Sequence, residues 1–141
     1  IVNPIEALKK IQNDIHFKGH NIKIVIANDS SIEINENIFV RSITNVLNNA
    51  IRVSTEIEVV ADITNELIKF SIHDNGPGIP DNEKLNVFKP FYRIDKSRNQ
   101  NTFNSGLGLA TTKALLSTIN GKISLHDSYM GGLEVIIEIP N

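Results

Sequence analysis

The most informative segment of the chain is IEVVADITNELIKFSIHDNGPG, residues 57–78. Apolar side chains recur there at every second position in two runs, Ile57, Val59, Ala61 and Ile63 followed by Ile68, Phe70 and Ile72. A period of two is typical of half-buried β-strands, and the polar residues 64–66 between the runs predict a turn. We therefore predict an antiparallel hairpin that ends at a glycine-rich turn.

Asp74 stands at the end of the second predicted strand. Side chains at positions 68, 70, 72 and 74 share one face of a strand, so the Asp74 carboxylate is expected on the same side as the apolar core. A carboxylate there is costly unless donors hydrogen-bond to it. A ligand amine would serve, and so would backbone N–H groups of the turn Asn75-Gly76-Pro77-Gly78-Ile79-Pro80. In the alternative interpretation, this turn is only a tight bend.

The flanking sequence alternates helical and strand periods with short connections. Asn3 is a predicted helix N-cap before Pro4, and four apolar residues continue the helical spacing up to Gly19: Ile5, Leu8, Ile11 and Ile15. Strands are predicted at 22–26 and, shorter, at Ile32 and Ile34, and helices at 35–52 and about 107–119. A second hairpin, with strands near 123–125 and 133–139, surrounds the turn Met130-Gly131-Gly132. This order predicts one α+β domain over residues 1–141.

The predicted helix 35–52 carries a polar row. Its apolar face is formed by Phe39, Val40, Ile43, Val46, Leu47, Ala50 and Ile51. Ser42, Asn45, Asn49 and Arg52 form the polar row on the other side. Because asparagine is a poor helix former, two of them one turn apart suggest a use, although a solvated face is the default for either alone. An amide oxygen suits Mg²⁺, and Arg52 is placed to meet a phosphate.

A long aperiodic segment and a second glycine motif follow. Residues 86–105 have no convincing period, which is typical of a solvated loop or of a lid over a site, and their position between two glycine motifs favours the lid. The motif Ser105-Gly106-Leu107-Gly108-Leu109 then opens a helix, where N–H groups and the helix dipole favour an anion such as phosphate. A packing role for these glycines is an equal alternative. The motif is neither a dinucleotide fingerprint nor a P-loop.

Composition excludes several classes of function. The 141 residues hold no cysteine, which excludes disulfide scaffolds, cysteine-ligated zinc and thiol catalysis. A total of 14 Lys and Arg against 16 Asp and Glu argues against a nucleic-acid partner. No apolar run approaches the ~18 to 20 residues that cross a bilayer. Because the sequence starts at Ile1 without a methionine, we expect a fragment of a longer protein.

Four motifs, in this order, resemble the ATP-binding catalytic domain of bacterial sensor histidine kinases. That domain belongs to the GHKL superfamily, which has the Bergerat fold and also contains DNA gyrase, heat-shock ATPase chaperones and MutL-type repair proteins. The matching segments are residues 45–52 for the N box, 74–78 for the first G box, 88–93 for the F box and 106–110 for the second G box. Flanking elements extend the resemblance over nearly the whole chain.

The resemblance implies a two-layer α/β sandwich, with a mixed, mostly antiparallel sheet of about five strands covered by about three helices. ATP would lie between the helices and a long lid at about 86–105. Asp74 would accept a hydrogen bond from the adenine amino group. Asn49 would ligate Mg²⁺, and Asn45 and Arg52 would lie near the phosphates. Asn45, Asn49 and Arg52 would therefore be the catalytic residues. Further nucleotide contacts are implied for Gly76, Gly78, Ile79, Arg98, Ser105, Gly106, Leu107, Gly108 and Leu109, with Arg93 as an alternative to Arg98.

Some positions bear on the lid and on departures from the family pattern. Phe88, Phe91 and Tyr92 would anchor the lid in apolar contact. Val53 stands where the family often has an aromatic residue, and Asn104 stands where a glycine is common. Neither departure removes a proposed ligand.

The resemblance also bears on whether the domain transfers the γ-phosphate as a kinase or hydrolyses ATP. The hydrolytic branches typically carry a glutamate where Asn45 stands, and without that carboxylate a histidine acceptor for the γ-phosphate is favoured over water. His16, His20, His73 and His126 lack the acceptor pattern and are predicted to be surface residues. The acceptor is therefore expected on a separate dimerisation domain that is absent from this chain. The alternatives are a nucleotide-binding signalling module without transfer, a GHKL ATPase, and a structural interaction domain.

The implied surroundings are those of two-component signal transduction. A response regulator would act downstream. The parent protein would be a membrane-anchored homodimer in the bacterial cell membrane, with this domain in the cytoplasm.

Overall fold

The computed structural model describes residues 1–92 and 108–141. Within these ranges the elements follow in the order α1 (Pro4–Asn13), β1 (Asn21–Asn28), α2 (Glu36–Val53), β2 (Glu56–Ile63), β3 (Leu67–Asp74), the 3-10 helices η1 (Asp81–Glu83) and η2 (Asn86–Phe88), α3 (Gly108–Ser117), β4 (Lys122–Asp127) and β5 (Leu133–Pro140). Among these helices, none has the length and apolar character that a membrane span requires.

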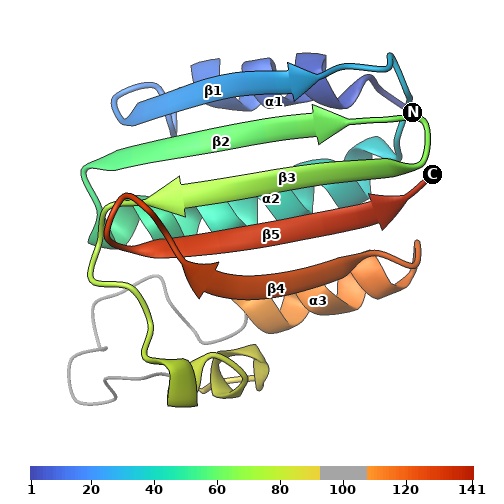
Figure 1. The fold of residues 1–141 in the computed structure, drawn as a ribbon. Coiled ribbons are helices and arrows are strands. Elements are labelled where there is room, and N and C mark those ends of the chain that lie inside the picture. The colour runs from blue at the N-terminus through green and yellow to red at the C-terminus, as the bar shows by residue number, and fades with distance from the viewer. Residues whose placement is uncertain (93–107) are drawn as a thin grey trace.

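The strands form one sheet in the order β1-β2-β3-β5-β4 (Figure 1). β1 pairs parallel to β2, and every other pair is antiparallel. β2 and β3 make the predicted hairpin, in which Ile57 lies opposite Asp74. β5 lies between β3 and β4, so the last hairpin joins the sheet through its second strand. The predicted mixed, mostly antiparallel sheet is confirmed.

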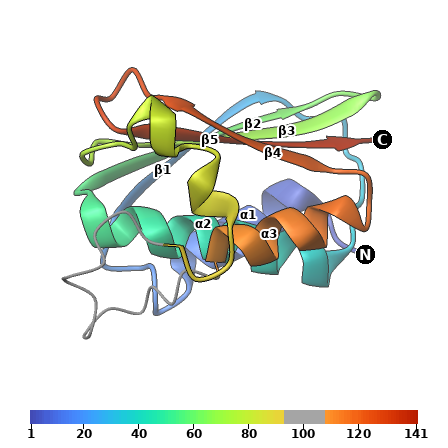
Figure 2. The ribbon, with the colours of Figure 1, turned by 90° about the horizontal axis from the view of Figure 1, so that it is seen from below.

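The helices α1, α2 and α3 cover one face of the sheet (Figure 2). α2 is the central helix, with α1 on one side and α3 on the other. The core fills the space between the layers, where the rings of Phe39 on α2 and Phe70 on β3 lie 5.1 Å apart. Asn3 and Asn35 cap α1 and α2 by accepting N–H groups of the first helical turn, which confirms both predicted helix starts.

Two expected elements differ in the structure. α1 ends at Asn13 instead of continuing to Gly19, and Ile15 is 93% exposed while Phe17 enters the core. Asn13 and Asp14 are weak helix formers, and Asp14 takes an extended backbone as the C-cap. The short strand expected at Ile32 and Ile34 is reduced to an isolated bridge between Ile34 and Val2.

Candidate functional site

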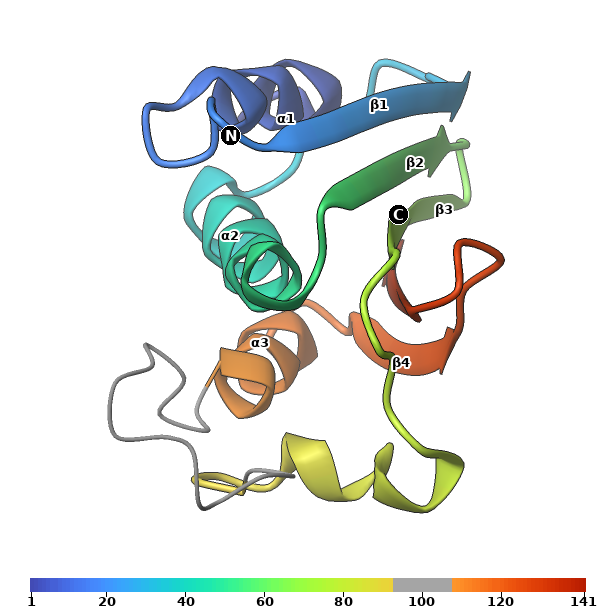
Figure 3. The same ribbon diagram turned by 90° about the vertical axis from the view of Figure 1, so that its left-hand side faces the viewer.

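Asp74 lies at the end of the two layers where β3 ends, α2 ends and α3 begins (Figure 3). It is 5% exposed, and its partner across the hairpin, Ile57, is a core residue. Its Oδ1 accepts the N–H of Gly76 at 2.9 Å and that of Leu133 at 3.2 Å. No described residue donates a hydrogen bond to Oδ2. Among the described residues, backbone donors therefore hold one carboxylate oxygen of Asp74 and leave the other without a donor.

The turn between β4 and β5 closes over Asp74. The N–H of Gly132 donates to the main-chain oxygen of Asp74 at 3.1 Å. A Cβ on Gly132 would lie 2.1 Å from Asp74 Oδ1 and 2.6 Å from the Asp74 main-chain oxygen, so only glycine allows this approach. Gly132 and Leu133 were not among the predicted site residues. The turn itself is visible in the sequence, but its position over Asp74 follows from the pairing of β3 with β5, which no local pattern reveals.

The glycine turn after Asp74 is fastened to the neighbouring elements. Asn75 Oδ1 accepts the N–H groups of Thr55 at 2.9 Å and Glu56 at 3.0 Å, at the start of β2. Gly76 packs against the end of α2, where an added Cβ would lie 2.7 Å from the main-chain oxygen of Val53. Ile79 is half-buried against the core. The segment is a tight bend and also one wall of the site.

The polar row of α2 faces α3, and its later residues, from Asn49 on, lie beside the start of α3 at the Asp74 end of the fold. Asn45 Nδ2 donates to Thr112 Oγ1 of α3 at 3.2 Å, and Gly108 at the start of α3 would place a Cβ 3.5 Å from Asn49 Nδ2. Arg52 Nη2 donates to Asn49 Oδ1 at 2.7 Å. The structure thus brings Asn45, Asn49, Arg52 and Gly108 together between the two helices.

Part of this polar row is buried instead of solvated. Ser42, expected with the polar row, is 1% exposed because α3 covers that side of α2. Thr112 is fully buried and was not a predicted site residue, although it holds Asn45 in place. Desolvation lowers the pKa of the Arg52 guanidinium from its usual value.

The donor set can be tested against the implied magnesium ion. No group of three His, Asp or Glu side chains suited to a metal occurs in the described residues. Asn49 Oδ1 is the amide oxygen at the mouth, and in this structure it accepts from Arg52. Mg²⁺ usually keeps several waters and takes one or two protein oxygens together with substrate phosphates. Asn49 fits that arrangement and does not fit a cation held by protein ligands alone.

The segment before residue 93 packs beside α3. Phe88 is half-buried, and Lys113 Nζ lies 5.3 Å from its ring, which agrees with the expected anchoring role. Lys84 Nζ donates to Ile79 O and to Asp127 Oδ1, both at 2.9 Å, and so ties this segment to the end of β4. Tyr92 hydrogen-bonds to Glu83. Phe91 was expected in apolar contact but is 69% exposed, because it lies at the tip of a turn with φ of 64°.

Several residues named from the sequence fall between the two described ranges. Arg93, Arg98, Asn104, Ser105, Gly106 and Leu107 lie outside the described residues, as does most of the expected lid. Leu109 follows on α3 and is half-buried against the core.

The expectation of four surface histidines is wrong for His73. His16, His20 and His126 are exposed, whereas His73 is 7% exposed. It lies on the outer face of the sheet as the alternation predicts, but Ser128 and Tyr129 of the β4–β5 turn cover it.

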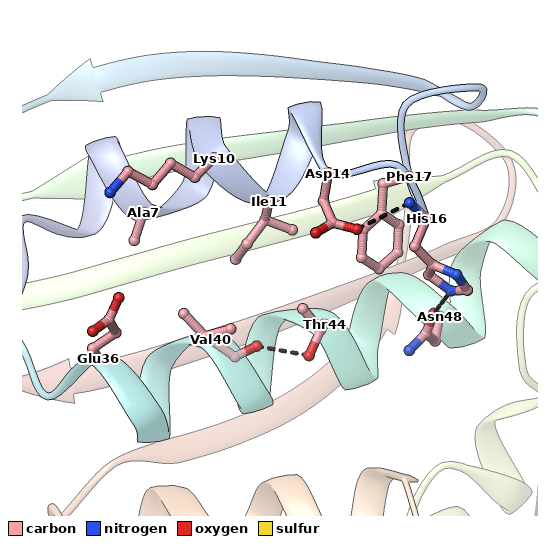
Figure 4. A pocket seen from close by; sticks show the side chains of 10 residues that line it. All are labelled: Ala7, Lys10, Ile11, Asp14, His16, Phe17, Glu36, Val40, Thr44 and Asn48. Carbon is pink, nitrogen blue, oxygen red and sulfur yellow. Dashed lines mark hydrogen bonds between the residues drawn. The ribbon is translucent and has the colours of Figure 1, made fainter.

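A separate cavity of about 390 Å³ lies between α1 and α2 (Figure 4). Ile11, Phe17 and Val40 give it apolar walls, and His16 at one end contacts Asn48 Oδ1 at 2.8 Å. No predicted site residue lines this cavity, so it is distinct from the Asp74 site.

Comparisons with known proteins agree with this arrangement. The family described as histidine kinase-, DNA gyrase B- and HSP90-like ATPase matches residues 34–141. Sensor histidine kinase CpxA of Escherichia coli K12 is 34% identical over 107 residues, which are 75% of this chain and 23% of CpxA. The chain thus spans about a quarter of the length of that relative.

Two solved structures share the fold. The nucleotide-free catalytic domain of histidine kinase ThkA has a TM-score of 0.80 at 21% identity, over 99% of this chain and 93% of that one. The ATP binding domain of PrrB from Mycobacterium tuberculosis has a TM-score of 0.78 at 21% identity, over 99% and 95%.

Proposed function

Because the chain belongs to the family of histidine kinase-, DNA gyrase B- and HSP90-like ATPases, we propose that its Asp74 site binds ATP with Mg²⁺ for transfer of the γ-phosphate to a histidine. The acceptor histidine would lie on a separate dimerisation domain. Similarity to sensor histidine kinases such as CpxA supports the transferase over the other activities of the family.

The observation that carries the proposal is the state of the Asp74 carboxylate. It is buried, two backbone N–H groups hold Oδ1, and Oδ2 has no donor among the described residues. Because Asp74 is only 5% exposed, little water competes for its carboxylate, and the exocyclic amine of a purine could donate a hydrogen bond to Oδ2. This favours adenine, which carries such an amine, over a base with a carbonyl at that position.

The phosphates would lie toward Asn49, Arg52 and the start of α3. Arg52 would pair with a phosphate, and the N-terminal end of α3 at Gly108 favours negative charge. A magnesium ion bound there would neutralise phosphate charge, with Asn49 as its protein ligand. Since Arg52 holds Asn49 Oδ1 in this structure, the guanidinium would turn away from Asn49 when that oxygen binds the ion.

Transfer rather than hydrolysis is favoured by the residue at position 45. Asn45 carries an amide that donates to Thr112, and an amide cannot act as a general base toward water. Of the four histidines, His73 is buried on the face of the sheet turned away from the helices, where it hydrogen-bonds to Ser128. The other three lack the sequence pattern of an acceptor, so the isolated chain would not phosphorylate itself.

The wider assignment follows the relatives. The chain would be the cytoplasmic catalytic domain of a membrane-anchored, homodimeric sensor kinase, with a response regulator receiving the phosphoryl group from the acceptor histidine. The alternative is a signalling module that binds nucleotide without transfer.

Titration calorimetry with a non-hydrolysable ATP analogue tests the base site. We expect Asp74→Asn to weaken binding at least tenfold, roughly the loss of one charge-assisted hydrogen bond. Asp29→Asn is a matched control, because Asp29 is an exposed aspartate that also accepts the N–H two residues on. Equal affinity of the Asp74 variant and the parent would remove the proposed base site.

The same titration with and without Mg²⁺ tests the metal ligand. Asn49→Ala is expected to abolish most of the gain in affinity that Mg²⁺ gives and to change the metal-free affinity little. Asn37→Ala, at an exposed position of the same helix, is the control.

Transfer is tested by adding a separate dimerisation domain that carries an acceptor histidine. Labelled phosphate from ATP should appear on that domain only when this chain is present. ATP binding without any transfer would favour the signalling module, and stable phosphohistidine on the isolated chain would contradict the assignment of the acceptor.

A further inference from the structure

His73 is held on the outer face of the sheet by two polar partners. Its Nδ1 lies 2.8 Å from Ser128 Oγ, and its Nε2 lies 3.4 Å from Glu134 Oε2 on the paired strand β5. The ring of Tyr129 covers it edge-on at 5.0 Å. His73 is therefore fixed by its contacts, although its strand face is the one turned away from the helices.

The chemistry of the partners favours one tautomer of the His73 ring. A carboxylate only accepts, so the tautomer with its hydrogen on Nε2 suits the contact with Glu134 at 3.4 Å. Nδ1 is then the acceptor, and the Ser128 hydroxyl donates to it. The same hydroxyl oxygen accepts the N–H of Met130 at 3.0 Å, so both functions of the hydroxyl are used.

Ser128 begins the turn that holds Asp74 from the other side. Its N–H donates to Gly132 O at 2.8 Å, and its own carbonyl accepts the N–H of Gly131 at 3.0 Å. Gly132 and Leu133 then donate to the main-chain oxygen and the carboxylate of Asp74. One short turn thus connects the His73 ring on the outer face to the carboxylate on the inner face.

We infer that His73 and Ser128 are positioning residues for base recognition, because their hydrogen bond fixes the β4–β5 turn that orients the Asp74 carboxylate. The inference rests on the proposed function, in which Asp74 accepts from the adenine amine. A hydrolytic serine–histidine–glutamate triad does not fit, since Ser128 is 8% exposed and its oxygen already accepts from Met130.

The test compares adenosine and inosine triphosphates, which differ at the base position that Asp74 would read. The ratio of their dissociation constants is measured by calorimetry for the parent chain, Ser128→Ala and His73→Phe. His73→Phe keeps a ring against Tyr129 and removes both nitrogens. We expect the preference for the adenine nucleotide to fall about fivefold in each variant, the effect of about one neutral hydrogen bond. Ser128→Thr, which keeps the hydroxyl, should retain the preference of the parent.

A second measurement separates a local change at the Asp74 carboxylate from a general loss of stability in the variants. The amide proton of Leu133 reports its hydrogen bond to Asp74, and its chemical shift is followed by NMR in nucleotide-free samples of the same variants. An unchanged base preference, an equal loss of affinity for both nucleotides, or an unmoved Leu133 amide would overturn the inference. If the parent itself shows no preference between the two nucleotides, the adenine contact of Asp74 fails instead, and the Leu133 amide still tests the link from His73 to the turn.

Discussion

Replacing Gly132 by alanine should damage the Asp74 site more than any other single methyl group added to the β4–β5 turn. The new Cβ would lie 2.6 Å from the Asp74 main-chain oxygen and 2.7 Å from the Gly76 nitrogen, and main-chain atoms cannot rotate away. Restoring ordinary van der Waals contact requires the turn to move by almost 1 Å. Hydrogen bonds of 3.1 and 3.2 Å from Gly132 and Leu133 do not survive such a shift.

The expected loss follows from those two bonds. One is a neutral backbone bond, and the other ends on a carboxylate, so together they contribute about 2.5 to 4 kcal/mol to the free energy of unfolding. Urea denaturation measures that loss. Calorimetry with the ATP analogue should show at least a tenfold rise in the dissociation constant in parallel, because the carboxylate loses its orientation.

Gly131→Ala is the matched control. At this neighbouring glycine an added Cβ meets nothing within 4 Å, but φ is +101°. Backbone strain alone should therefore cost about 1 to 2 kcal/mol, without a change in nucleotide affinity. If Gly132→Ala lost less stability than Gly131→Ala, the packing of the turn on Asp74 would be refuted. A large loss of stability with unchanged nucleotide affinity would refute the role of Asp74 in binding.

Three further outcomes are expected. Ser42→Ala should leave stability unchanged or raise it by up to about 1 kcal/mol in urea denaturation, because Ser42 Oγ is buried without a hydrogen-bond partner among the described residues; a clear loss would show a missed partner. Thr112→Val should cost about 0.5 to 1.5 kcal/mol, since it removes the acceptor of the half-buried Asn45 amide at nearly constant volume, and a neutral result would contradict that contact. Lys84 lowers the pKa of the Asp81 carboxyl by hydrogen bonding and charge, so the pair stabilises the fold above the ordinary pKa of aspartate and the effect is lost as pH falls through the lowered value. Lys84→Met should move the NMR titration of Asp81 upward toward 3.8, and an unmoved titration would exclude the pairing.

The parts of the fold that depend on local pattern were predictable from the sequence. Period-two runs located β2 and β3, and the Asn3 cap marked the start of α1. Alternation along β3 placed Asp74 at the end of a core-facing row, and helical spacing placed Asn45 and Asn49 one turn apart. These features depend on neighbours within about one helical turn or two strand residues, which the sequence records directly.

Where several elements pack on one residue, the local pattern was insufficient. Ser42 was expected with the polar row, yet α3 buries it. His73 was expected at the surface, yet the β4–β5 turn covers it. In both cases the sequence predicted correctly which face of the helix or strand carries the side chain. It did not predict the element that packs on that face, because this element comes from a distant part of the chain.

The sequence by itself determined the element types, the α+β class and the residues that resemble a nucleotide site. Only the tertiary structure decided which groups hold that site together. The donor from Leu133 to Asp74 is separated from it by 59 residues, and it exists because β5 pairs with β3 instead of lying at the sheet edge. Strand order is a collective result of packing and pairing over the whole sheet, so no segment read alone specifies that Gly132 must be small or that Ser128 must meet His73.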